Sequence, residues 1–258
     1  MTESLKKHIQ EFCEVNGISL DAASTIPEKR PIDYGYCVPG CEVCQGLGLI
    51  ASDDGGWAAC PNNPRRFYNS GVSESDAQLW KVLPQKTKAV ERIMDALKAA
   101  LKARKGFVYI HGTPGIGKTV CARAFTVEAI QAGMRALYTR QSELINHLRA
   151  SYDTERGQEE YQTRLRLYKD IDWLTIDELG RDRMNDFARE SLAEIIDARY
   201  TSALIRNKVT ILVSNFAPEE IFPAYIVDRV RDKQNVVLAL QGRSLRQDRK
   251  STRLNSSH

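Results

Sequence analysis

Residues Gly112–Thr119 read GTPGIGKT, and this stretch decides how the rest of the chain is interpreted. It matches G-x-x-x-x-G-K-[ST], the pattern of a phosphate-binding loop. Residues Phe107–His111 before it are apolar and aromatic, which predicts a short buried strand. Residues Val120–Phe125 after it continue as a helix. A glycine turn can match the pattern by chance, but the strand–loop–helix context favours a phosphate site.

The residue types in this loop match the chemistry of a nucleotide's phosphates. Glycines let the backbone turn tightly, so that its N–H groups and the start of the following helix can hold phosphate oxygens. Lys118 would place a positive charge on the β- and γ-phosphates, and the Thr119 hydroxyl would be a magnesium ligand. We therefore expect ATP and Mg²⁺ as cofactors.

A second motif lies downstream, where Ile171–Glu178 reads IDWLTIDE. The apolar residues predict a buried strand, and ligands of open α/β sheets lie at the carboxyl ends of strands. Asp177 would complete the magnesium shell and Glu178 would polarise the attacking water. The alternative, an acidic strand end without chemistry, is weakened by the phosphate loop upstream.

Strands and helices alternate along this part of the chain. Further strands are expected at 136–138, at 209–213 and at 236–240, with helices at 86–104 and at about 186–205. This alternation predicts an α/β fold with a mainly parallel five-stranded sheet covered on both faces. Asn215 follows one strand, where its amide could reach the γ-phosphate or the attacking water.

Four of the six cysteines, Cys37, Cys41, Cys44 and Cys60, fall in one short segment. Cys41 and Cys44 form a C-x2-C pair followed by glycines, as in a zinc knuckle. Cys60 and Cys37 could complete a tetrahedral structural Zn²⁺ site. The alternatives are four free thiols or an iron–sulfur cluster.

We expect four regions from these features. They are an amino-terminal helix and linker at 1–36, a cysteine-rich zinc-binding module with a connector at 37–85, the ATPase domain at 86–246 and a disordered tail at 247–258. The helix could pack on its own chain or on a partner. The tail resembles translated adapter sequence and is expected to be foreign to the protein.

Charge and hydropathy limit the possible partners. The net charge is +4, and residues 243–258 account for it, so overall charge does not indicate nucleic-acid binding and only local patches could. The charged run at 153–170 is either a solvated helix face or a DNA-facing element. No apolar run approaches the ~20 residues of a membrane span, and no signal-peptide core begins the chain. We expect a cytoplasmic protein without a membrane partner.

Residues 86–246 resemble the AAA+ ATPases of the DnaC/DnaI helicase-loader group and its relative, the IstB transposition helpers. The resemblance rests on GTPGIGKT, on WLTIDELG, on VSNF at 213–216, on IVDRV around Arg229 and on GRSLR at 242–246. It implies ATP hydrolysis at subunit interfaces of a homo-oligomer. It makes Asn215 the sensor, Arg229 an arginine finger acting on a neighbour's ATP, and Arg246 a late nucleotide-sensing arginine.

The resemblance extends to the cysteine segment, because some loaders carry a zinc-binding amino-terminal part and IstB proteins usually do not. The segment departs from that part at Cys60-Pro61-Asn62-Asn63, which lacks a second cysteine pair. The expected function is loading of a replicative ring helicase onto single-stranded DNA. Two alternatives remain, a transposition helper on double-stranded DNA and a zinc-dependent adaptor with an ATP-binding switch. The expected nucleotide-binding residues are Gly112, Thr113, Pro114, Gly115, Ile116, Gly117, Lys118, Thr119, Asp177 and Arg246.

Overall fold

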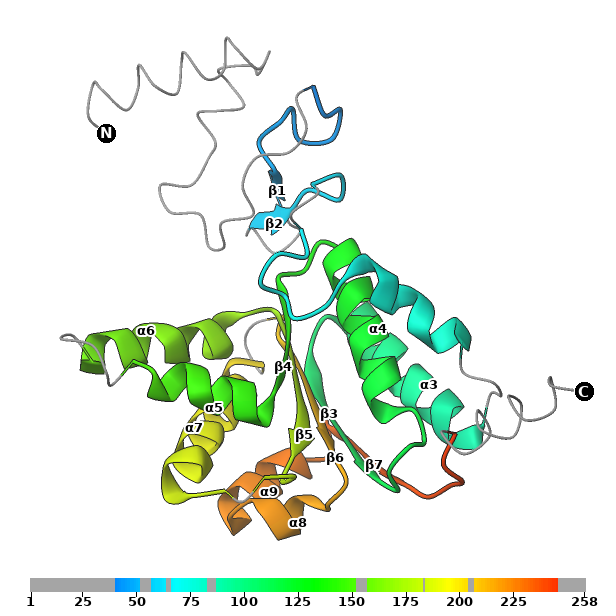
Figure 1. Ribbon diagram of the computed structural model, residues 1–258, viewed down its shortest axis with the longest axis vertical. Coiled ribbons are helices and arrows are strands. Elements are labelled where there is room, and N and C mark those ends of the chain that lie inside the picture. Colours follow the sequence, from blue (N-terminus) through cyan, green and yellow to red (C-terminus); the bar gives the residue numbers. More distant parts are fainter. Residues whose placement is uncertain are drawn as a thin grey trace, which may run out of the picture. The chain divides into compact units, whose positions relative to one another are not determined.

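The computed structural model describes residues 40–51, 57–63, 66–82, 87–151, 157–182, 184–203 and 207–245 (Figure 1). The chain forms two compact units. One contains the described residues up to Asn69 together with Ala129–Arg135, and the other contains Ser70–Glu128 and the described residues from Ala136 onward. The expected amino-terminal helix, Cys37, Arg246 and the tail at 247–258 lie outside the described residues.

The larger unit is built on a five-stranded sheet in which every strand pairing is parallel. Its strand order is β4-β5-β6-β3-β7, which confirms the predicted α/β fold. The chain crosses from β6 over β3 to reach β7, so the strand before the phosphate loop lies inside the sheet. The strands are β3 (Gly106–Gly112), β4 (Ala136–Arg140), β5 (Trp173–Leu179), β6 (Val209–Ser214) and β7 (Val236–Leu240).

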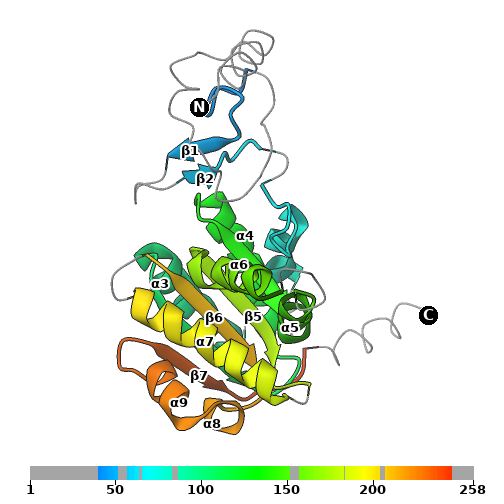
Figure 2. The ribbon, with the colours of Figure 1, turned by 90° about the vertical axis from the view of Figure 1, so that its left-hand side faces the viewer.

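Helices cover both faces of this sheet. In Figures 1 and 2, α3 and α4 lie on one side and α5, α6 and α7 on the other. Burial on two faces explains why β6 reads as a continuous apolar run, with every residue buried. The helices are α3 (Lys88–Ala103), α4 (Lys118–Gln131), α5 (Gln141–Arg149), α6 (Gly157–Asp170), α7 (Asp186–Ala203), α8 (Pro218–Ile221) and α9 (Ala224–Val230).

Helix α3 shows how local sequence sets an element's limits. The Thr87 hydroxyl accepts a hydrogen bond from the Val90 N–H at 3.3 Å and caps the first turn. Arg104 adopts a left-handed conformation at the other end and closes the helix. The buried face includes Ile93 and Leu97, both fully buried. The helix predicted at 86–104 is therefore present, two residues shorter at its start and one at its end.

A buried arginine joins α7 to the beginnings of two strands. Arg199 is fully buried. Its guanidinium donates to Thr210 Oγ1 at 2.7 Å and to the carbonyl oxygens of Tyr168, Ile171 and Val209 at 2.9, 2.7 and 2.7 Å. Every one of these acceptors is neutral. These dipoles contribute to stabilising the buried charge. The contacts connect α7 to the end of α6, to the residue range just before β5 and to the start of β6.

In the described part of the smaller unit up to Asn69, the buried apolar residues are the cysteines and residues that lie between them. Strands β1 (Leu49–Ala51) and β2 (Trp57–Ala59) pair antiparallel, with Leu49 opposite Ala59. The side chains of Leu47 and Leu49 are buried next to the cysteine segment. A 3-10 helix, η1 (Glu74–Val82), then leads toward α3 and belongs to the larger unit. Among the helices described, none combines the length and the apolar character needed to cross a membrane.

Candidate nucleotide-binding site

The predicted nucleotide residues that the structure describes lie at the carboxyl edge of the sheet. The phosphate loop begins at the last residue of β3, Asn215 follows β6, and Asp177 and Glu178 lie just before Leu179, the last residue of β5. These three strands are neighbours in the order β5-β6-β3. Because all three are parallel, their carboxyl ends lie at the same edge, where ligands of open α/β sheets bind. The strand order therefore gathers motifs that are far apart in the sequence.

Two glycines of the phosphate loop have positive φ angles and lie close to the end of β7 and the residues after it. Gly112 has φ +123°, and a Cβ there would lie 1.8 Å from the Leu240 carbonyl oxygen. Gly115 has φ +84°, and its Cβ would lie 2.2 Å from Ser244 Oγ. The Leu245 N–H also donates to the Gly115 oxygen at 3.0 Å. The end of β7 and the residues after it are thus packed against the loop. A side chain at Gly112 would collide with the Leu240 backbone, and one at Gly115 would require the Ser244 side chain to move, in addition to the strain of a positive φ at either position.

Lys118 begins α4 and turns back over the phosphate loop. Its Nζ donates to the carbonyl oxygens of Gly112 and Thr113 at 2.7 and 3.0 Å, and to Asn215 Oδ1 at 2.9 Å. Lys118 is 6% exposed. An ammonium group held by three oxygen acceptors is oriented for phosphate oxygens, which are stronger acceptors because they are charged. The contact also places the predicted sensor, Asn215, beside the phosphate loop.

The two acids near the end of β5, Asp177 and Glu178, have different environments. Asp177 is 2% exposed, and its Oδ1 accepts the Glu178 N–H at 2.7 Å. Glu178 has φ +57°, and the pairing with β6 shifts register between Ile176 and Leu179. A left-handed conformation is unfavourable for a non-glycine residue and is common at functional sites. Here it turns the Glu178 carboxylate outward, toward Arg181 and, at 3.9 Å, toward Arg140 Nε.

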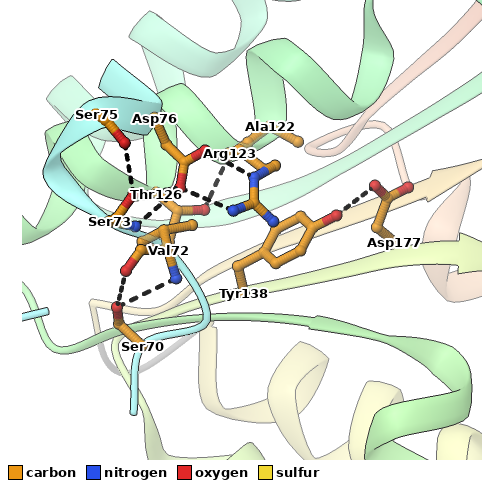
Figure 3. A network of polar contacts seen from close by, with 10 residues as sticks. All are labelled: Ser70, Val72, Ser73, Ser75, Asp76, Ala122, Arg123, Thr126, Tyr138 and Asp177. Atoms are coloured by element: carbon orange, nitrogen blue, oxygen red, sulfur yellow. Dashed lines mark hydrogen bonds and ion pairs between the residues drawn. The ribbon is translucent and has the colours of Figure 1, made fainter. Parts of the chain in front are cut away.

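A chain of polar contacts extends from Asp177 to the start of the larger unit (Figure 3). Tyr138 donates its hydroxyl to Asp177 Oδ2 at 2.7 Å. The Arg123 guanidinium lies 4.7 Å from the centre of the Tyr138 ring and donates to both oxygens of Asp76. None of Tyr138, Arg123 and Asp76 belongs to a motif that predicts the site. A tyrosine in a strand and an arginine in a helix match ordinary core and surface patterns, so no sequence signal marks them.

Arg229 lies near the end of α9, away from its expected local partners. The acids nearest to it in the sequence are Asp228 and Asp232, but the guanidinium makes an ion pair with Asp197 on α7. It also lies 5.5 Å from the centre of the Tyr225 ring. The Arg229 side chain remains 31% exposed. The other expected arginine, Arg246, lies just beyond Leu245, the last residue described.

The smaller unit brings three of the four predicted cysteines together. The sulfur atoms of Cys41, Cys44 and Cys60 all lie within 4.8 Å of one another, and all three residues are buried. The Gly48 N–H donates to Cys44 Sγ at 3.3 Å, and Asn62 Nδ2 donates to Cys41 Sγ at 3.6 Å. Cys41 and Cys60 are 3.7 Å apart at sulfur, too far for a disulfide. Burial is the main cause that raises the pKa of the Cys60 thiol.

The ligand atoms of the cysteine group fit Zn²⁺, and those at the carboxyl edge of the sheet fit Mg²⁺. Three converging sulfur atoms, two of which accept N–H groups, suit Zn²⁺. The group could hold this ion. At the sheet edge, the buried carboxylate of Asp177 and the exposed hydroxyl of Thr119 are oxygen donors of the kind that Mg²⁺ prefers.

The parallel sheet, the phosphate loop and the acidic end of β5 define a nucleotide-binding α/β protein of the AAA+ type. Two solved structures share this fold. DnaA from Aquifex aeolicus with bound AMPPCP aligns with a TM-score of 0.56 and 17% identity, over 71% of this chain and 56% of that one. The DnaC helicase loader aligns with a TM-score of 0.50 and 23% identity, over 64% of this chain and 99% of that one.

The chain belongs to the family of IstB-like ATP-binding proteins, whose family model matches residues 83–253. A curated relative is the ATP-binding protein of insertion sequence IS5376 from Geobacillus stearothermophilus. It is 28% identical over 158 residues, which is 60% of this chain. The match spans 61% of that relative's length. The predicted membership in the IstB-like AAA+ proteins is thus confirmed, and the fold is similar to those of DnaC and DnaA.

Proposed function

We propose that this protein binds ATP with Mg²⁺ at the carboxyl edge of the sheet and hydrolyses it. The observation that supports this most directly is the contact between Lys118 Nζ and Asn215 Oδ1 at 2.9 Å, with the buried Asp177 near the carboxyl end of β5, the strand that neighbours β6. A phosphate-binding lysine, a sensing amide and a magnesium carboxylate therefore share one edge of the sheet. Bound Mg²⁺ would neutralise charge on the β- and γ-phosphates.

Different residues of the chain would bind the phosphates, hold Mg²⁺ and activate the attacking water. The loop N–H groups and the start of α4 bind the phosphates. Lys118 exchanges its carbonyl partners for phosphate oxygens, and Asn215, released from Lys118, can orient the γ-phosphate or the attacking water. Asp177 and Thr119 would hold Mg²⁺. Glu178, turned outward by its left-handed backbone, accepts the proton of the water as general base. Arg229 of a neighbouring subunit completes the site in a homo-oligomer.

The nucleotide site is tested with Lys118→Ala. This change removes the cation that the loop orients, so we expect ATP affinity to fall below detection in a titration with a fluorescent ATP analogue. Lys102→Ala, in the last turn of α3, is a matched control that removes a lysine from a helix elsewhere in the unit. Unchanged affinity in the Lys118 variant would refute the assignment of the phosphate loop.

For the biological role, we propose an ATP-dependent DNA replication protein that loads a replicative ring helicase onto single-stranded DNA. Two observations support this role. The ATPase unit shares its fold with the DnaC helicase loader. It is preceded by a three-cysteine group able to hold Zn²⁺, and the resemblance described above associates such a module with loaders rather than with transposition helpers.

The second candidate is a transposition helper that assembles on double-stranded DNA. It is favoured by the family itself and by the relative encoded in an insertion sequence. DNA preference separates the two roles. Fluorescence anisotropy with single-stranded and double-stranded oligonucleotides, with and without ATP, should show ATP-dependent binding to single strands in a loader. Preference for the duplex, combined with failure to retain a ring helicase in a pull-down, would favour transposition.

A further inference from the structure

The buried carboxylate of Asp177 has one hydrogen-bond donor on each oxygen. The Glu178 N–H donates to Oδ1 at 2.7 Å, and the Tyr138 hydroxyl donates to Oδ2 at 2.7 Å. The first donor is part of the backbone, whereas the second is supplied by a side chain of the neighbouring strand β4. Tyr138 therefore determines the orientation of one carboxylate oxygen.

Tyr138 is in turn held by a segment that precedes the ATPase motifs. The Tyr138 N–H donates to the Ser70 oxygen at 2.8 Å. Gly71 has φ +72°, and a Cβ there would lie 1.9 Å from the Tyr138 carbonyl oxygen. The backbone at Ser70 and Gly71 is therefore packed directly on β4. These two residues begin the segment 70–82, which we call the connector. In the sequence, the connector is the stretch that links the cysteine segment to α3.

The connector also reaches the ring of Tyr138 through a pair of charges. Asp76 in η1 is 6% exposed and accepts Arg123 Nε at 3.0 Å and Nη2 at 2.8 Å. The Ser73 N–H donates to the same carboxylate at 2.8 Å. Burial alone would raise the pKa of Asp76, but the bonds from Arg123 and Ser73 outweigh it and lower that pKa. The ion pair fixes the guanidinium over the Tyr138 ring (Figure 3).

We propose that Tyr138 is a positioning residue for the magnesium carboxylate Asp177, and that the connector sets the position of Tyr138 through Ser70 and the Asp76–Arg123 pair. The inference rests on the proposed binding of Mg²⁺ and ATP at this edge. Its consequence is a coupling between the magnesium site and the segment that leads from the cysteine unit. Such coupling is reciprocal, so whatever displaces the connector weakens magnesium binding, and bound magnesium holds the connector in place.

The first test is Tyr138→Phe, which removes the hydroxyl and keeps the ring under Arg123. Affinity for a fluorescent ATP analogue is measured with Mg²⁺ and again in EDTA. We expect the gain in affinity from Mg²⁺ to fall about 10-fold, as for other residues that orient metal ligands, with affinity in EDTA unchanged. Tyr161→Phe is the matched control, because this buried tyrosine bonds Ser191 Oγ instead.

The second test asks whether the connector affects magnesium binding through Tyr138. Asp76→Asn should reduce the magnesium-dependent gain about threefold, and it should have no further effect in a Tyr138→Phe background. Equal effects in both backgrounds would overturn the coupling. Arg123→Lys keeps a charge but loses the two-point contact, and it replaces Tyr138→Phe in this cycle if thermal melting shows that the tyrosine variant is unfolded.

The outcomes distinguish this inference from the proposed function. If Mg²⁺ does not increase the affinity of the wild-type protein for the nucleotide, the proposed function fails and the inference fails with it. If the wild-type protein shows the increase and Tyr138→Phe shows the same increase, Tyr138 does not position Asp177 and only the inference is overturned. A loss of affinity in EDTA as large as that in Mg²⁺ would assign Tyr138 a purely structural role.

Discussion

Replacing Arg229 by alanine tests whether two subunits share each nucleotide site. In the structure, the guanidinium makes an ion pair with Asp197 and lies 5.5 Å from the Tyr225 ring centre. The side chains of Arg229 and Asp197 are 31% and 43% exposed. Arg229 Nη1 and Asp197 Oδ1 have no hydrogen-bond partner of good geometry within the described part of the chain, although the two groups form an ion pair. Because the pair is partly exposed and such pairs contribute little to stability, we expect Arg229 to be able to exchange Asp197 for a neighbour's phosphate.

Arg229→Ala should have a small effect on the free energy of unfolding and a large effect on the rate of ATP hydrolysis. A half-exposed ion pair contributes about 0–1 kcal/mol, and a cation–π contact at an exposed site contributes about 0.5–1 kcal/mol. Arg229→Ala should therefore lower the free energy of unfolding by no more than about 2 kcal/mol. A guanidinium that stabilises the charge on the γ-phosphate contributes about 10³–10⁵ in rate in related enzymes. Hydrolysis should thus fall by orders of magnitude while the fold and ATP binding persist.

The assay combines single variants with a mixture. Arg229→Ala should bind ATP normally and hydrolyse it poorly. Mixed with Lys118→Ala protein, which binds no ATP but still carries Arg229, it should recover part of the activity. Arg231→Ala is the matched control, because Arg231 lies two residues away and pairs with Glu219 on the surface. This control should retain wild-type turnover.

Two results would refute the reasoning. The first is full activity of Arg229→Ala alone, which would leave the residue only its pair with Asp197. The second is no recovery in the mixture under conditions in which size-exclusion chromatography shows an oligomer. If Arg231→Ala loses activity and Arg229→Ala does not, the finger is assigned to the wrong arginine of this segment.

Three further predictions follow from the site and the fold. Glu178→Gln should keep ATP bound but slow hydrolysis about 10²-fold or more, because an amide cannot accept the proton of water; normal single-turnover rates would assign the base elsewhere. The cysteine segment should bind about one Zn²⁺ per chain, and a chelator should unfold residues 37–66 while the ATPase unit melts unchanged; metal analysis that finds no zinc in protein prepared without chelator would end this idea. Arg199→Met should cost about 3 kcal/mol or more in urea unfolding, because it leaves several buried acceptors unpaired, and a loss below about 1 kcal/mol would show that those acceptors find other partners.

Local sequence determined the features that depend on neighbouring residues. The phosphate loop could be read directly, because phosphate binding requires glycines, Lys118 and Thr119 at fixed spacing before a helix. Apolar runs that alternate with helical segments were sufficient to predict the five strands and the parallel sheet, because strands of a parallel sheet are buried on both faces and are therefore apolar along their length. The C-x2-C pair also depends only on neighbouring residues. It predicts a metal-binding group because one tight turn directs both sulfur atoms to the same side.

Tertiary structure decided the contacts that depend on strand order. Lys118 meets Asn215 across 97 residues of sequence because β6 inserts between β5 and β3. Tyr138 reaches Asp177 across 39 residues because β4 pairs with β5 in one register, and Asp76 reaches Arg123 across 47 because the connector packs on β4 and α4. Arg229 finds Asp197 on another helix rather than an adjacent acid. Local propensity and periodicity determine which face of an element is buried but not which element covers it, so the partners of these side chains follow only from the folded arrangement.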